Sequence, residues 1–223
     1  QKVLEIDPTH SIARINYGAT LEEAGDHAGA AEQFRAVLEK KPDDPYANYY
    51  YAVSLSKLGK REEARAHLAK TLAADPRFAD ASHYLGVLFE QEGLHEEALE
   101  QFRAALRDRP DDTRILSSIG VTLNAMGRRA EAIRSYEEAR RRDPTLADAH
   151  YNLANCLADA GRLDEAIAHY RRAVASDSQH RGVDVAHGDV RPVSLAPQDS
   201  ESDVAGAAGH VEEPFARPRV CLV

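Results

Sequence analysis

Residues 79–112 read ADASHYLGVLFEQEGLHEEALEQFRAALRDRPDD, and the rest of the chain repeats this pattern at a fixed spacing. Its proline is one of five that each lie 34 residues from the next: Pro8, Pro42, Pro76, Pro110 and Pro144. Similarity at a fixed period of this length is the signature of a repeat architecture. The chain is therefore predicted to be an array of stacked units rather than one or two globular domains.

The period divides the chain into five complete units. With the proline at position 32 of each unit, the units are 11–44, 45–78, 79–112, 113–146 and 147–180. Residues 1–10 form the end of an incomplete preceding unit. Residues 181–223 contain Gly and Pro and no 3.6-residue apolar period, which predicts a disordered tail. The other interpretation of this tail is the start of a second domain.

Four positions within the unit predict a pair of helices. Position 8 is small (Gly18, Ala52, Gly86, Gly120, Ala154) and position 20 is alanine (Ala30, Ala64, Ala98, Ala132, Ala166). Position 15 is glycine (Gly25, Gly59, Gly93, Gly127, Gly161) and position 24 is large (Phe34, Leu68, Phe102, Tyr136, Tyr170). Glycine ends the first helix because it tolerates the left-handed conformation there, and proline stops the second. Small residues let the two helices approach closely, so each unit is expected to be an antiparallel helical hairpin.

This pattern resembles the tetratricopeptide repeat family over about residues 1–180. The resemblance implies an all-α fold, an α-solenoid of antiparallel helical hairpins wound into a right-handed superhelix. The sequence departs from the family at position 4, where a frequent tryptophan is replaced by Arg14, Asn48, Ser82, Leu116 and His150. In this family, partners usually bind the concave face that the first helices of the units line.

The resemblance also implies which residues line that groove, at positions 2, 5, 6, 9, 12 and 13 of each unit. The candidate peptide-binding residues are Ile12, Ile15, Asn16, Tyr46, Tyr49, Val53, Lys57, His83, Val87, Arg114, Asn124, Tyr151, Asn152 and Asn155. Tyr50 and Tyr84 belong to the same lining or, alternatively, pack between units. The whole lining has six carboxylates (Glu22, Glu23, Asp80, Glu90, Asp148, Asp159) against Lys57 and Arg114. A protein or peptide segment with apolar anchors and basic residues is therefore the expected partner.

Composition excludes several other classes of protein. The 223 residues are 43% hydrophobic and 29% charged, as in a soluble folded protein. A net charge of −9 argues against nucleic-acid binding, and no apolar stretch is long enough for membrane insertion.

The sequence also contains no motif for chemistry. Two Cys and ten His show no metal-ligand spacing, and no phosphate-binding loop or nucleophile motif occurs. No cofactor, metal or catalytic residue is therefore predicted. The histidines His27, His67, His95 and His169 are interpreted as solvated surface residues, and Cys156 as a small packing residue.

These observations leave two hypotheses about function. The first is a non-catalytic protein–protein interaction scaffold that binds partner segments in its groove. The alternative is the substrate-recruiting arm of a larger enzyme, such as a transferase, whose catalytic domain is absent from this chain. The observation behind this alternative is that the chain starts at Gln1 rather than at Met. The small number of cysteines favours a cytoplasmic location. A leader removed from the N-terminus would also fit the start at Gln1. The Ala- and Arg-rich units resemble those of bacterial proteins.

Overall fold

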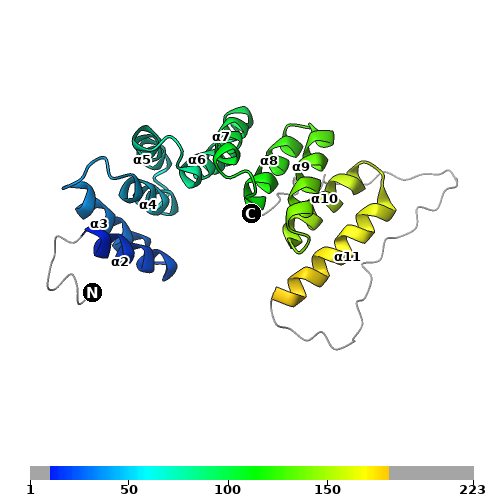
Figure 1. Ribbon diagram of the computed structural model, residues 1–223, viewed down its shortest axis with the longest axis horizontal. Coiled ribbons are helices and arrows are strands. Elements are labelled where there is room, and N and C mark those ends of the chain that lie inside the picture. Colours follow the sequence, from blue (N-terminus) through cyan, green and yellow to red (C-terminus); the bar gives the residue numbers. More distant parts are fainter. Residues whose placement is uncertain (1–10, 181–223) are drawn as a thin grey trace, which may run out of the picture.

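The computed structural model describes residues 11–180, which form ten helices in five hairpins (Figure 1). The hairpins are α2 (Ser11–Glu23) with α3 (His27–Leu38), α4 (Pro45–Lys57) with α5 (Arg61–Ala74), α6 (Ala79–Gln91) with α7 (His95–Asp108), α8 (Thr113–Ala125) with α9 (Arg129–Arg142), and α10 (Ala147–Asp159) with α11 (Leu163–His180). No strand occurs among these described residues. The predicted all-α solenoid of helical hairpins is confirmed. The incomplete unit at residues 1–10 and the predicted disordered tail at 181–223 lie outside the described residues. The boundaries of the five 34-residue units remain a prediction, and we keep their numbering to describe positions within the hairpins.

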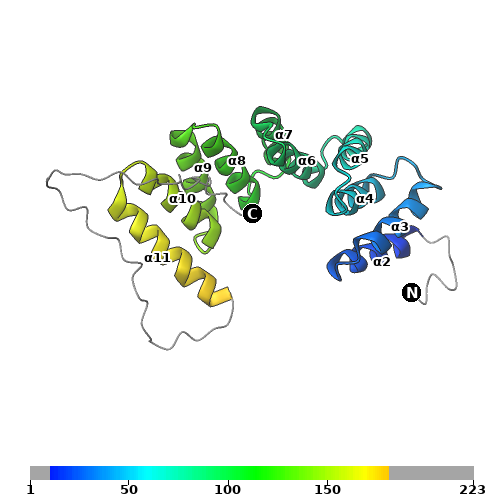
Figure 2. The same ribbon diagram turned by 180° about the vertical axis from the view of Figure 1, so that it is seen from behind.

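Successive hairpins follow one another along an arch, with α2 near one foot and α11 at the other (Figures 1 and 2). Each second helix packs against the first helix of the next hairpin. The first helices also contact one another, α2 with α4, α6 with α8, and α8 with α10. We call the exposed and half-exposed side chains of these first helices, at positions 2, 5, 6, 9, 12 and 13, the inner surface.

The turns within the hairpins use glycine as the sequence predicts. The five glycines at position 15 have φ between 75° and 82°, two residues beyond the end of each first helix. This left-handed conformation costs glycine little and other residues more. Aspartates cap two first helices, since the side chain of Asp44 accepts a hydrogen bond from Ala47 N and that of Asp112 accepts one from Arg114 N. Each cap satisfies a backbone N–H group at the start of its helix that has no partner within the helix.

The two helices of a hairpin interlock at positions 8 and 24. A Cβ atom on Gly120 would lie only 2.5 Å from the Tyr136 ring, and one on Gly86 would lie 2.6 Å from the Phe102 ring. The second hairpin uses a larger and a smaller partner, Ala52 and Leu68, both fully buried. The pair therefore fills the space between the helices in different ways. A buried ring lies against glycine in three hairpins, alanine faces the smaller Leu68 in the second, and alanine faces the half-buried Tyr170 in the last.

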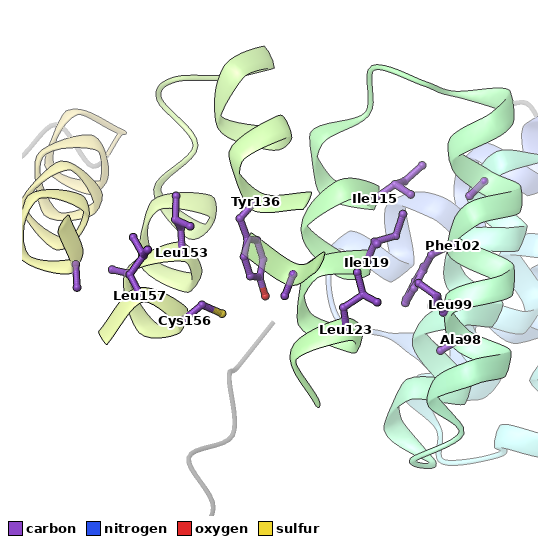
Figure 3. Packing of buried hydrophobic residues seen from close by; sticks show 14 residues of the cluster. Ala98, Leu99, Phe102, Ile115, Ile119, Leu123, Tyr136, Leu153, Cys156 and Leu157 are labelled. Atoms are coloured by element: carbon purple, nitrogen blue, oxygen red, sulfur yellow. The ribbon is translucent and has the colours of Figure 1, made fainter. Parts of the chain in front are cut away.

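The core continues from hairpin to hairpin rather than closing within one. One buried cluster extends from α7 to α11, and Figure 3 shows Phe102, Ile119, Tyr136 and Leu153 following one another through it. A second cluster joins α4, α5 and α6. The half-buried Phe89 packs against both clusters and so connects them. Cys156 is 1% exposed within the first cluster, which confirms its predicted packing role.

Polar pairs replace the family's tryptophan at position 4. The residue at this position hydrogen-bonds to position 23 of the second helix in three hairpins: Arg14 to Gln33 at 2.8 Å, Asn48 to His67 at 2.7 Å and His150 to His169 at 2.9 Å. His150 Nε2 also lies 3.1 Å from the carbonyl oxygen of Pro144, and Asn48 Nδ2 donates to that of Pro42 at 2.8 Å. These bonds tie the turn between hairpins to the hairpin that follows.

The interpretation of the histidines as solvated was therefore wrong for His67 and His169. Position 23 faces position 4 across the hairpin, so both rings are half-buried and hydrogen-bonded. His27 is also engaged, since its Nδ1 lies 2.8 Å from the carboxylate of Glu22. The sequence indicates only that these histidines lie in a loop or on a second helix. Neither place reveals whether the ring meets a hydrogen-bond partner or solvent.

The His150–His169 contact requires a neutral His150 ring. Because His150 Nε2–H donates to the Pro144 carbonyl, its Nδ1 is the acceptor for Nδ1–H of His169. Burial lowers the pKa of His150, and burial together with the nearby His150 lowers the pKa of His169. A second proton on His150 would place two N–H groups against each other.

This pair predicts acid sensitivity of the last hairpin. Both histidines have lowered pKa values in the folded chain, so their stabilising contribution is complete above their unfolded value of about 6.5 and is lost as the pH falls below it. We expect His150→Asn, which copies Asn48, to keep both hydrogen bonds and reduce proton uptake on unfolding by about one per chain. Urea unfolding at pH 7.5, 6.5 and 5.5 measures this, and an unchanged pH dependence would contradict it.

The interlock at positions 8 and 24 predicts a rescue. Gly120→Ala should destabilise the chain by about 1–2 kcal/mol, because the clash with the buried Tyr136 ring outweighs the better helix propensity of alanine. Adding Tyr136→Leu recreates the Ala52–Leu68 pair and should recover most of that loss. Urea midpoints of both single variants and the double variant measure the coupling. Simple addition of the two single effects would argue against the interlock.

Candidate functional site

Four aromatic rings gather on the inner surface where the second hairpin meets the third. The Tyr46 and Tyr49 rings lie 5.3 Å and 5.2 Å from the Phe78 ring, and Tyr49 lies 6.4 Å from Tyr84. Tyr46 is 59% exposed, whereas Tyr49, Phe78 and Tyr84 are half-buried. We call Tyr46, Tyr49, Phe78 and Tyr84 the aromatic cluster. Tyr46 presents most of its ring to solvent, whereas the other three rings also pack against the buried cluster of α4, α5 and α6.

Local sequence explains how these rings come together. Tyr46 and Tyr49 are three residues apart, and so lie on one face of α4. The Asp44 cap and Pro45 fix the first turn of that helix. Phe78 immediately precedes α6, at position 34 of its unit. Sequence reasoning missed Phe78, although Asp44 and Asp112 at the same position of other units mark it as unusual.

The cluster holds Tyr49 in its neutral form. Burial, and after it the negative charge of Asp80, raises the pKa of Tyr49 to about 12. The positive charge of Arg114 acts in the opposite direction. At neutral pH the Tyr49 hydroxyl is therefore a hydrogen-bond donor and acceptor that carries no charge.

Ion pairs reduce the acidic excess that the sequence indicates for this surface. Arg109 binds Asp80 through two hydrogen bonds of 2.6 Å and 2.7 Å. Glu22 accepts from Ser54 and contacts His27, and Asp159 lies 3.8 Å from Arg129. The six carboxylates that the sequence places on the lining are therefore partly paired with residues outside the lining positions, on second helices, in turns or on a neighbouring unit. Within residues 11–180, the carboxylates of the lining without an ion pair are Glu23, Glu90 and Asp148.

Polar residues connect α6 to α8 beside the aromatic cluster. His83 Nε2 lies 3.0 Å from Ser118 Oγ, and Ser118 Oγ donates to the carbonyl oxygen of Arg114 at 3.1 Å. Burial, and after it the charge of Arg114, lowers the pKa of His83. The Arg114 side chain itself binds Asp112 at 2.9 Å. The surface next to the rings therefore offers neutral donors and acceptors and paired charges.

The remaining candidate residues do not join this group. Residues with exposed side chains are Ile12, Asn16, Lys57 and Tyr151, and half-buried ones are Ile15, Val53, Val87, Asn124, Asn152 and Asn155. On α10, Tyr151 packs edge-on against Tyr170 at 6.0 Å, and Asn155 accepts a 2.6 Å hydrogen bond from the Tyr170 hydroxyl. Val87 packs against the core. Tyr50 stacks on Phe34 of the preceding hairpin at 5.6 Å, so it packs between units.

Two further features of the described residues concern metal binding and membrane insertion. No group of three or more His, Cys, Asp or Glu side chains within residues 11–180 is arranged to hold a metal ion. Across the same residues, none of the helices combines the length and the apolar character that crossing a membrane requires.

Comparison with known proteins identifies the family. One sequence profile of the tetratricopeptide repeat matches residues 52–113 and 120–181, more than half of the chain. The chain belongs to the tetratricopeptide repeat family. A second profile of the same repeat matches residues 21–82. A search of curated proteins found no match.

Several solved structures share this tetratricopeptide repeat fold. PilF of Pseudomonas aeruginosa is 22% identical with a TM-score of 0.71, and the match covers 74% of this chain and 76% of that one. MamA from Desulfovibrio magneticus RS-1 is 18% identical with a TM-score of 0.67, over 76% of this chain and 96% of that one. YrrB, described as a TPR protein with an unusual peptide-binding site, is 22% identical with a TM-score of 0.62, over 81% and 93%. Likeness at this identity shows the fold alone.

The raised pKa of Tyr49 predicts a loss of stability in alkali. The folded value of about 12 lies above the unfolded value of about 10, so the contribution of this group is complete below pH 10 and is lost as the pH rises towards 12. Tyr49→Phe should remove a loss on the order of 2 kcal/mol between pH 9 and 12. Urea unfolding across this range measures it, with both chains compared at pH 7 as the control. Parallel curves for the two chains would disprove the assignment.

Proposed function

We propose that this tetratricopeptide repeat protein is a non-catalytic scaffold whose inner surface binds a segment of a partner protein. The observation that carries the proposal is the aromatic cluster, because an exposed Tyr46 ring supported by three half-buried rings forms an anchoring site for apolar side chains. The fourteen candidate residues of the lining remain the proposed binding surface, with the aromatic cluster at its centre.

The chemistry of this surface supports a partner segment with apolar and basic residues. The exposed face of Tyr46 suits aliphatic or proline side chains, and arginine or lysine side chains stack on tyrosine rings. Glu23, Glu90 and Asp148 offer carboxylates to basic residues. The neutral Tyr49 hydroxyl and the His83 ring fix orientation through hydrogen bonds rather than charge.

The structural likeness adds support for protein binding without identifying the partner. YrrB shares the fold and is described as having an unusual peptide-binding site. The cytoplasmic location and the bacterial source stay predictions. The alternative hypothesis, a recruiting arm of a larger enzyme, also stays a prediction, which the full-length gene sequence would decide.

The proposal predicts loss of binding when the rings are removed. Peptides selected on a random peptide array should bind at least 10-fold more weakly to Tyr46→Ala and to Tyr49→Ala, because truncated aromatic anchors cost more than about 1.4 kcal/mol each. Fluorescence anisotropy with the selected peptides measures this. Leu163→Ala is the control, since Leu163 is a 60% exposed apolar residue at the start of the second helix α11 and lies outside the proposed binding surface. If every selected peptide bound both cluster variants as tightly as the original chain, the site assignment would be wrong.

A further inference from the structure

The end of the chain has the chemistry expected of a partner segment. Residues 214–223 read PFARPRVCLV, with two arginines, no acidic residue, and the apolar side chains of Phe215, Val220, Leu222 and Val223. By contrast, residues 181–213 contain seven acidic residues and two arginines. The basic and apolar character of the tail is therefore confined to its last ten residues.

The inner surface complements this segment in both respects. The aromatic cluster offers an apolar area between α4 and α6, of which Tyr46 is 59% exposed. Aromatic surfaces of this kind bind proline-containing segments, whose extended backbone loses little entropy on binding. Glu90 of α6 and Glu23 at the end of α2 carry no ion pair within residues 11–180, so each is available to an arginine.

The connecting stretch is long enough for the segment to reach this surface. The 33 residues from 181 to 213 span at most about 110 Å when fully extended. For comparison, α11, with 18 residues, is about 27 Å long. Attachment to the same chain raises the effective concentration of the segment to about the millimolar range, so even weak contacts would keep the surface occupied.

We propose that residues 214–223 bind the aromatic cluster of their own chain and occupy the inner surface until a partner segment of similar chemistry displaces them. This inference rests on the proposed function, because it assigns an occupant to the same site. Phe215 and Val220 supply the apolar anchors, and Arg217 and Arg219 supply the charges for Glu23 and Glu90. Free partner segments then bind with an affinity reduced by the fraction of chains whose surface is open.

A spin label on Cys221 tests the inference in the full chain. Cys156, the other cysteine, is 1% exposed, so a nitroxide reagent modifies Cys221 under native conditions. We expect the amide NMR signals of Tyr46, Tyr49 and Tyr84 to lose more than half of their intensity, independently of protein concentration. Amide signals of α11, in the last hairpin at the other foot of the arch, should keep theirs.

Charge reversal supplies the matched variants. Arg217→Glu with Arg219→Glu should restore the signals of the aromatic cluster and raise the affinity for array-selected peptides several-fold. Arg181→Glu with Arg191→Glu makes the same change in charge outside the segment and should do neither. Broadening that grows with concentration would assign the segment to a second copy, and broadening elsewhere or none at all would also overturn the inference.

The same measurements separate this inference from the proposed function. If array peptides bind through Tyr46 and Tyr49 while the label broadens no cluster signal, the proposed function stands and the intramolecular contact is refuted. If the label broadens the cluster signals but no array peptide binds even the Arg217→Glu, Arg219→Glu chain, the intramolecular contact stands and binding of partner segments is refuted.

Discussion

The distance between the two helices of each hairpin governs the rest of this structure. A glycine or alanine at position 8 lies against a bulky side chain at position 24, and no Cβ fits between Gly120 and the Tyr136 ring. This contact sets how closely the helices approach, and therefore which residues face each other on either side of it. The stack of hairpins then extends the core from one unit to the next, because each second helix covers the first helix of the following hairpin.

Polar pairs take the place of tryptophan at position 4 in three of the five hairpins. With the helices fixed, positions 4 and 23 face each other across a narrow gap that two medium-sized polar side chains can bridge. Asn48 with His67 and His150 with His169 solve this problem in related ways, and each also bonds to the carbonyl of the preceding proline. A buried polar pair is stable only when its members satisfy each other, so Nδ1 of His150 must stay unprotonated to accept from His169. The polar pairs thus connect the turn between two units to the packing inside the hairpin that follows.

The sequence predicted the helical hairpins and their turns because the same residue types recur at the same positions of every unit. Glycine at position 15 and proline at position 32 mark turns wherever they occur, and a single unit would have left the helix ends ambiguous. The site was harder, since its residues vary from unit to unit and depend on contacts across units. Tyr46 and Tyr49 follow from the lining positions, but Phe78 lies outside them and Arg109 reaches Asp80 from the end of the opposite helix. Ion pairing between units cannot be read from a pattern of period 34.

Variation on the inner surface is possible because the hairpin contacts do not depend on it. Interior positions of the unit must keep their sizes, whereas the lining positions include exposed and half-buried side chains that differ between units. The aromatic cluster arises at one such place, where Tyr46 and Tyr49 of α4 meet Phe78 at the start of α6. Rings that bridge two units are held in place by the spacing of the hairpins on both sides. The interior residues therefore make the surface rigid, whereas the lining residues determine its chemistry. Under the proposed function, binding specificity would reside in the few positions that the interlock leaves unconstrained, and it could change without loss of the fold.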